Sequence, residues 1–404
     1  MNKRVLIAFI TIFLATLSVR AEGDVASYSE SGIIGLISER INKDEKQSEK
    51  LEKWSRYCRV NGFIQGMYAW SDNQTSNTTT GSSSFSVHRA RFIVSGNLLQ
   101  NKKGRKLDYL FYGDMVFLPK SPILSTQISY HHSNAFNVVI GQMQNPIHFE
   151  EQFRPTKFEF IDFSYAACYL GKLGGNDLTT KDVPLREMGI RLHGGFFQRD
   201  GYCLLNYNIG VFNHPGILLM NTNKSADFFC RLFVMPTRNL VIAAHCQWGE
   251  DDFSKVLLNN PDTYASYRWN GSPEYLMLHR WGGGVTYVTD TVFMRSEYIA
   301  GWTGHLSSEA CYIEGGYKYH LPKQLGFAWA GAMVDYFCRD TFDYVKRDTK
   351  NAAIDMRYTL SFGWEPSALY RIQLAYSLEQ RLHYTFPNNR PFSNSLKLLA
   401  TASF

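Results

Sequence analysis

The chain of 404 residues lacks any hydrophobic run long enough for a spanning helix once its first twenty residues are passed. Charged or polar residues interrupt every later apolar stretch well before the roughly 20 residues that such a helix needs. Mean hydropathy is only −0.25. Aromatic residues nevertheless make up 15% of the chain. This mixture is typical of a membrane barrel, whose strands alternate faces and average to neutral hydropathy, and also of a secreted β-sandwich or β-helix.

Cysteine pairs and metal-ligand spacings are also missing. The number of cysteines is odd and no CxxC pair occurs, which argues against a disulfide framework and a structural zinc site. On the expected strands, Cys230 and Cys246 fall on the apolar side, where a thiol behaves as a small hydrophobe. The seven cysteines are Cys58, Cys168, Cys203, Cys230, Cys246, Cys311 and Cys338.

Strong charge of one sign and enzyme motifs are lacking as well. The net charge is +6, and Lys3, Arg4 and Arg20 near the N-terminus account for three of these charges. The remaining +3 is too mild to predict nucleic-acid binding. The sequence contains no GxSxG, HExxH, P-loop or Rossmann fingerprint. We therefore expect no catalytic centre, no metal and no cofactor.

The N-terminus predicts export. A basic pair, Lys3 and Arg4, precedes the uncharged apolar run 5–19, and residues 19–21 fit a small-x-small cleavage site. We expect residues 1–21 to be a signal peptide. Residues 22–57 are charged and contain no proline, which predicts a short helical periplasmic leader. A short coiled coil and a disordered leader are the alternatives.

Residues 58–404 alternate apolar and polar side chains with the period of a β-strand. A slip of one residue would move every side chain to the wrong face, so such alternation fixes the register. We predict an all-β fold, a transmembrane antiparallel barrel of about sixteen strands. The expected strands are 60–70, 84–99, 107–118, 123–130, 136–143, 187–197, 203–211, 226–236, 240–248, 280–289, 291–301, 310–319, 325–336, 353–364, 369–379 and 394–404.

The connections between these strands alternate in length. Every other connection is a short turn, while those between, such as 302–309, are mostly long. Outer-membrane barrels have this arrangement, with turns in the periplasm and loops outside. The terminal Phe404 shares the lipid-facing parity of its strand and resembles the signal that the barrel-assembly machinery recognises. These features predict a protein of the bacterial outer membrane, in contact with its lipid.

Basic side chains concentrate on the face expected to line the lumen. An arginine on the lipid face would cost about 2–4 kcal/mol at the bilayer midplane. The energetics therefore favour the lumen face, which is also where the alternation places these arginines. The planar guanidinium group of arginine carries paired N–H donors that match the oxygen atoms of an anion. Carboxylates that line the lumen are the alternative partners for several of these arginines. The residues expected to line the solute path are Arg89, Arg91, Arg154, Lys157, Arg191, Arg231, Arg357 and Arg371.

The longest connection, 144–186, is unusually aromatic for an outer loop. It carries Phe149, Phe153, Phe158, Phe160, Phe163 and Tyr165. We expect this segment to fold inward and narrow the pore.

Several short stretches together resemble the phosphate-selective porin O and P family over roughly Asn61 to Phe404. They are Val87-His88-Arg89-Ala90-Arg91 with Gly96, Gly141-Gln142 with Asn145-Pro146, Arg186-Glu187-Met188-Gly189-Ile190 with His193-Gly194, Gly210-Val211-Phe212-Asn213, and Arg231-Leu232 with Met235-Pro236. The resemblance implies a homotrimeric porin that selects anions through an arginine ladder and a lysine-rich vestibule. Arg89, Arg91, Arg186 and Arg231 match family positions. Lumen-facing lysine is sparse here, with Lys318 the clearest, which departs from the family pattern.

The leading hypothesis is therefore a passive diffusion porin for small, anionic, phosphate-like solutes. One alternative is a barrel enzyme acting on envelope lipid or peptide, which would need His193 or His245 beside a serine or an aspartate. Another is a plugged barrel with an adhesion or structural role.

Overall fold

The computed structural model describes residues 57–72, 82–101, 104–117, 123–150, 154–171, 186–213, 226–252, 275–303, 306–322, 325–339, 353–382 and 392–404. The predicted signal peptide 1–21 and nearly all of the predicted leader 22–57 lie outside these residues. Among the described residues, no helix is long and apolar enough to cross a membrane.

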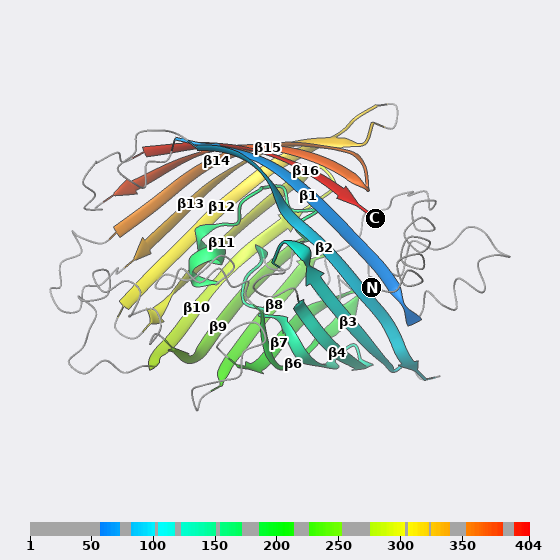
Figure 1. Cartoon of the computed structure of the whole chain (residues 1–404). Coiled ribbons are helices and arrows are strands. Elements are labelled where there is room, and N and C mark those ends of the chain that lie inside the picture. Colours follow the sequence, from blue (N-terminus) through cyan, green and yellow to red (C-terminus); the bar gives the residue numbers. More distant parts are fainter. Residues whose placement is uncertain are drawn as a thin grey trace, which may run out of the picture.

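Sixteen antiparallel strands form one closed barrel, in which each strand pairs with its neighbours in sequence and β1 pairs with β16 (Figure 1). The predicted fold class is thereby confirmed. The strands are β1 (Arg59–Ser71), β2 (Ser82–Gln100), β3 (Lys106–Asp114), β4 (Ile123–Ser133), β5 (Phe136–Gln144), β6 (Arg186–Arg199), β7 (Tyr202–Phe212), β8 (Asp227–Thr237), β9 (Leu240–Asp252), β10 (Tyr275–Val288), β11 (Val292–Thr303), β12 (Leu306–His320), β13 (Phe327–Arg339), β14 (Ala353–Ser367), β15 (Tyr370–Leu382) and β16 (Phe392–Ser403).

Strand ends differ from the sequence-based bounds in two informative places. The predicted strand 107–118 stops at Asp114, where a 3-10 turn, η1 (Met115–Phe117), begins. The Asp114 carboxylate accepts the Val116 N–H at 3.1 Å, and such a local bond competes with the strand ladder. The predicted long connection 302–309 shrinks to 304–305, because β11 and β12 continue their pairing as far as Thr303 and Leu306.

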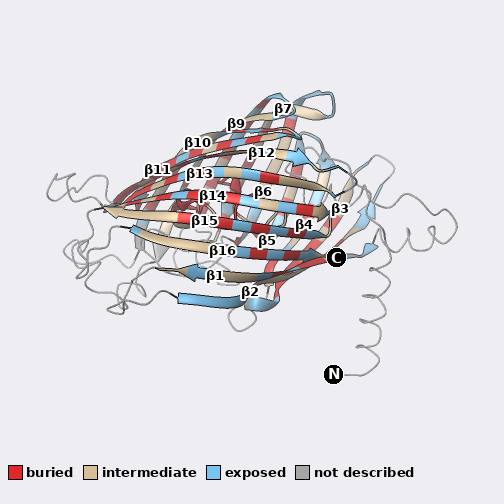
Figure 2. Cartoon of the chain, turned by 90° about the horizontal axis from the view of Figure 1, so that it is seen from above, coloured by how far each residue is buried: buried red, intermediate tan, exposed pale blue. Residues whose placement is uncertain are grey.

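The two faces of the barrel wall differ as the alternation predicts. Buried and exposed residues alternate along the strands in Figure 2. On the outer face of the central strands, Ile313, Leu360 and Phe362 are at least half exposed. Their inward-facing neighbours, such as Glu314 and Ser361, are buried. A continuous apolar outer surface on a closed barrel is what a hydrocarbon surrounding requires.

The last residue extends the pairing of β1 with β16, the two strands that close the barrel. Gly62 and Phe404 exchange two backbone hydrogen bonds of 2.9 Å, which continue the β1–β16 ladder beyond Ser403. On β16, Leu398 faces outward and Leu399 faces inward, as the sequence alternation predicts. Recognition of Phe404 by an assembly machinery stays a prediction.

Candidate solute pathway in the barrel lumen

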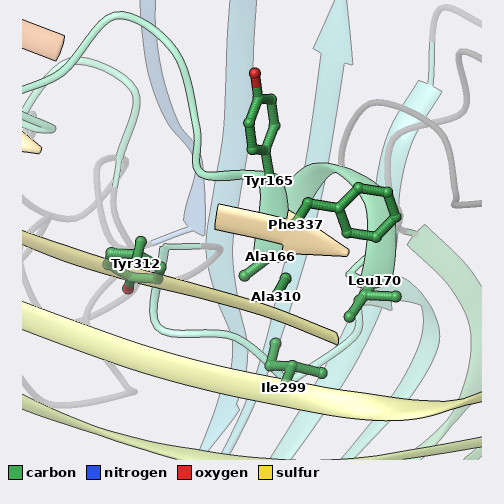
Figure 3. Close-up of a cluster of buried hydrophobic side chains, with 7 residues drawn as sticks. All are labelled: Tyr165, Ala166, Leu170, Ile299, Ala310, Tyr312 and Phe337. Atoms are coloured by element: carbon green, nitrogen blue, oxygen red, sulfur yellow. The ribbon is translucent and has the colours of Figure 1, made fainter. Parts of the chain in front are cut away.

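The connection between β5 and β6 enters the barrel, where it places a short π-helical turn, η3 (Ala166–Leu170), against the wall (Figure 1). We refer to its described residues, 145–150 and 154–171, as the inner loop. Ala166 and Leu170 of η3 pack with Ile299 of β11, Ala310 of β12 and Phe337 of β13 (Figure 3). Burial of these apolar side chains against one another fixes η3 to that part of the wall.

The aromatic residues of the inner loop form a second contact with the wall. Phe158 and Phe160 pack with Phe293, Trp329 and Met333, which lie on the inward faces of β11 and β13. Each of the five is at most 3% exposed. The aromatic character of this segment is therefore used for packing against the wall, while Phe153 lies outside the described residues.

Wall side chains also bind the backbone of the inner loop, because its carbonyl groups have no strand partner of their own. The donors come from β1, β13, β14 and β15. The bonds are Gln65 Nε2 to Pro155 O (3.4 Å), Arg371 Nη1 to Thr156 O (2.7 Å), Gln373 Nε2 to Phe158 O (3.1 Å), Trp329 Nε1 and Ser361 Oγ to Glu159 O (3.2 and 2.6 Å), and Arg357 Nη2 to Phe163 O.

Glu159 supplies the central ion pairs between the inner loop and the wall. Its carboxylate lies 2.8 Å from Arg295 Nη2 and 2.7 Å from Lys318 Nζ. Arg295 also binds Glu314 at 2.6 Å. Glu159, Arg295 and Glu314 are each about 1% exposed, so solvent screens these contacts weakly. A further pair, Asp162 with Lys397 at 2.6 Å, fixes the loop to β16.

The charges around Glu159 determine the pH at which its own ion pairs with Arg295 and Lys318 are lost. Burial alone would raise the pKa of Glu159, but Arg295, Lys318 and Arg371 lower it from 4.5 to about 2. A carboxylate with a lowered pKa stabilises the folded state above its ordinary pKa, and this contribution is lost as the pH falls toward 2. The ion pairs of Glu159 with Arg295 and Lys318 should therefore persist at mildly acidic pH.

The loss of these ion pairs can be followed in single-channel recordings at stepwise lower pH. We expect closures to stay rare down to about pH 4 and to increase below about pH 3, where Glu159 takes up a proton. An increase in closures already between about pH 6 and pH 5 would contradict a controlling role for Glu159 and indicate another titrating group.

The eight predicted path residues fall into different environments. Arg231, Arg357 and Arg371 are only 2%, 6% and 4% exposed. Arg357 pairs with Asp335 at 2.6 Å, and the Arg371 guanidinium lies 4.0 Å from the centre of the Trp329 ring. Arg231 stacks on Phe149 at 4.7 Å. These three arginines hold the inner loop against the wall.

The other five predicted residues retain contact with solvent. Lys157 is exposed and forms an ion pair with Glu365 of β14, while Arg154 is half-buried. Arg89, Arg91 and Arg191 are half-buried on the inward faces of β2 and β6. Of the eight predicted residues, those in contact with solvent are therefore Arg89 and Arg91 of β2, Arg191 of β6, and Arg154 and Lys157 of the inner loop.

Two arginines lie against one tyrosine on this part of the wall, and a third arginine lies near them on β2. The guanidinium groups of Arg91 and Arg186 lie 5.6 and 5.2 Å from the centre of the Tyr112 ring. Arg91 also binds Asp114 at 2.6 Å. Arg89, two residues from Arg91 along β2, donates to Gln65 Oε1 at 3.0 Å. We call Arg89, Arg91 and Arg186 the arginine cluster.

The arginine cluster combines three positive charges with the negative charge of Asp114. Its other described hydrogen-bond partners, Gln65, Tyr112 and Ser125, are neutral. Planar guanidinium groups on a lumen wall can replace part of the hydration of a passing anion. Arg186 is not among the predicted solute-path residues, because it is the first residue of β6 and precedes the clear alternation.

The two histidines of the enzyme alternative have other partners. The Nδ1 atom of His245 lies 3.7 Å from Glu297, whose second oxygen lies 3.6 Å from Nδ1 of His148. The His193 ring lies 6.4 Å from that of His131. Within the described ranges, neither His193 nor His245 hydrogen-bonds to a hydroxyl group, and no cluster of His, Cys, Asp or Glu is suited to a metal ion.

Solved structures share this architecture. The anion-selective porin from Comamonas acidovorans matches with a TM-score of 0.60 and 8% identity, over 86% of this chain and 99% of that chain. OprB of Pseudomonas putida matches with a TM-score of 0.60 and 10% identity, over 89% and 97%. The trimer form of OmpT, an outer membrane protein of Vibrio cholerae, matches with a TM-score of 0.55 and 9% identity, over 86% and 100%.

No family model matches the chain, and no curated protein matches it either. Membership of the phosphate-selective family therefore stays a prediction. The shared architecture, found at identities of about one in ten, establishes the fold: the chain is a sixteen-stranded transmembrane β-barrel with the architecture of the bacterial outer-membrane porins.

Proposed function

We propose that the protein is a passive diffusion channel of the bacterial outer membrane for small hydrophilic anions. The observation that carries this proposal is the arginine cluster on the inward faces of β2 and β6. Arg89 of this cluster also lies 5.8 Å from the ring centre of Phe163, so the cluster borders the inner loop. A hydrated anion passing this part of the wall would meet guanidinium donors, whereas a cation would be repelled.

The solute class follows from the same groups. Guanidinium forks match the oxygen atoms of phosphate and carboxylate groups, so small phosphate-like or carboxylate anions are the proposed solutes. The lysines Lys157 and Lys318 are already engaged with Glu365 and Glu159. This engagement favours general anion preference over tight phosphate binding, because a compact ammonium group in a close ion pair offers fewer donors to a passing solute.

A homotrimer in outer-membrane lipid is the proposed assembly. The trimer form of Vibrio cholerae OmpT, which has this fold, supports the proposal by analogy. Export through residues 1–21 and recognition of Phe404 by the barrel-assembly machinery belong to the same proposal.

The test is single-channel recording of the refolded protein under a salt gradient. The double variant Arg89→Gln/Arg186→Gln removes two charges from the arginine cluster and keeps the Arg91–Asp114 pair intact. At a separation of about 8 Å in a medium of intermediate dielectric, one charge contributes roughly 1 kcal/mol to the energy of an ion. We expect the anion-to-cation permeability ratio to fall at least about fivefold.

A matched control is Arg381→Gln, because Arg381 has a carboxylate on each side: Asp355 at 3.7 Å and Glu379 at 3.6 Å. We expect this change to leave the permeability ratio nearly unchanged. An equal shift in both variants would refute a special role of the arginine cluster. Folded barrels without any conductance would refute the channel itself and favour the plugged-barrel alternative.

A further inference from the structure

Two cysteines lie directly opposite each other on neighbouring strands. In the antiparallel pairing of β8 with β9, the register matches Cys230 with Cys246. The other cysteines on strands have different partners; Cys311, for example, lies between Tyr298 and Tyr336. Among the described strands, Cys230 and Cys246 are thus the one pair of cysteines that the register brings together.

Both thiols point to the outer face of the barrel. Cys230 alternates with the buried Phe229 and Arg231, and Cys246 alternates with the buried His245 and Gln247. The two thiols are free and are in hydrogen-bonding contact with each other. They face the membrane side by side and do not line the lumen.

The geometry is close to that of a disulfide. Directly opposed residues of antiparallel strands have Cβ atoms about 4.5–5.5 Å apart, whereas a disulfide joins Cβ atoms about 3.5–4.5 Å apart. A shift of roughly 1 Å between two strands that are already paired suffices to form the bond. The hairpin turn 238–239 keeps the two cysteines near each other even before the rest of the barrel has formed.

We propose that Cys230 and Cys246 form a disulfide that covalently links the two strands of the β8–β9 hairpin. Both S–H bonds break and one Sγ–Sγ bond forms, while the S–S bond of a disulfide-bearing oxidant opens to two thiols. The oxidant thereby receives two electrons and two protons. Exchange of this kind proceeds through a thiolate, which hydrocarbon does not stabilise, so the bond forms before lipid covers the hairpin.

The timing of this bond rests on the proposed export, because an exported chain passes through a compartment that supplies disulfide oxidants before it reaches the outer membrane.

The disulfide would fix the register of β9 against β8. A slip of β9 by one residue would turn Cys246 inward and His245 outward, and a bond to Cys230 excludes that arrangement. The disulfide would therefore select the correct pairing early in assembly.

The test is a mass measurement on the full-length protein, purified from membranes after denaturation in N-ethylmaleimide without reductant. The proposal expects more than half of the protein to carry a peptide that links Cys230 to Cys246, with Cys311 alkylated. The linked peptide should separate on reduction with a gain of two hydrogens. Alkylation of both thiols in most molecules, or a link from either one to a different cysteine, would overturn the proposal.

Variants extend the measurement. Cys246→Ser should leave Cys230 open to alkylation, while Cys311→Ser, a matched change on the outer face, should leave the link intact. Reductant should lower the heat-unfolding temperature of the wild type but not that of Cys246→Ser. An equal effect of reductant on the wild type and on Cys246→Ser would show that the disulfide does not stabilise the hairpin. These readings depend on mass and stability alone, so a failed conductance test leaves them unaffected.

Discussion

The variant Glu159→Gln is expected to release the inner loop from the wall and to convert steady conductance into frequent closures. The substitution keeps the size of the side chain and removes its charge. Lys318 then loses its carboxylate partner, and Arg295 keeps only Glu314 of its two carboxylates. Breaking a buried ion pair by removing one partner costs about 3–5 kcal/mol. This is a large fraction of the roughly 5–15 kcal/mol by which a folded domain is stable.

The cost falls on the loop and not on the barrel, because strand pairing does not involve the Glu159 side chain. Trp329 and Ser361 still bind the Glu159 carbonyl, so the loop should return to the wall between closures. Single-channel dwell times measure this directly, and limited proteolysis of the refolded protein supplies a second reading.

The control for this prediction is Glu379→Gln. Glu379 also faces the lumen and pairs with an arginine, Arg381, but at 3.6 Å and with its side chain 24% exposed. Exposed pairs of this kind contribute about 0–1 kcal/mol. We expect open times like those of the wild type. If Glu159→Gln and Glu379→Gln behave alike, the Glu159 ion pairs do not hold the loop.

A second large effect is expected on the outer face, where Ile313→Arg should destabilise the barrel in a bilayer. Ile313 is the central residue of β12 and its side chain is 63% exposed. An arginine at the bilayer midplane costs about 2–4 kcal/mol, and near the interface about 0–1 kcal/mol. The unfolding free energy in phospholipid vesicles, measured with denaturant, should fall by the midplane cost of about 2–4 kcal/mol.

Tyr319→Arg is the matched control for this change. Tyr319 lies on the same face of the same strand, next to its end at His320, and is 58% exposed. The same substitution there should lower the unfolding free energy by about 1 kcal/mol at most. Equal costs at both positions would show that lipid does not surround the centre of β12.

Much of the barrel could be predicted because lipid and lumen impose a strict period of two on every strand. All sixteen expected segments correspond to strands. Their ends were harder to place, because ladder hydrogen bonds continue where the side chains no longer alternate. The start of β2 at Ser82 is an example, since its first residues are a run of serines.

The role of each lumen arginine could not be predicted from parity. Parity places Arg357 and Arg371 inside the barrel, and the structure agrees. Whether such a side chain faces solvent or a loop backbone depends on contacts between residues about two hundred positions apart. One signal was present in the sequence: Phe293, Trp329 and Met333 are apolar side chains on the lumen parity. Such residues indicate that another segment covers that wall.

The contacts of residues 154–165 of the inner loop concentrate on one sector of the wall, so selection can treat the two sectors differently. The sector formed by β11–β16 and β1 binds residues 154–165 of the loop through many side chains at once, so a change there risks the open state. On β2 and β6, Arg89 and Arg186 donate to Gln65 and Ser125, and Arg89 makes one contact with the loop, at 5.8 Å from the Phe163 ring centre. Mutations on β2 and β6 can therefore change the solute preference of descendant proteins while the pore stays open. We expect related barrels to diverge fastest in solute specificity on these two strands.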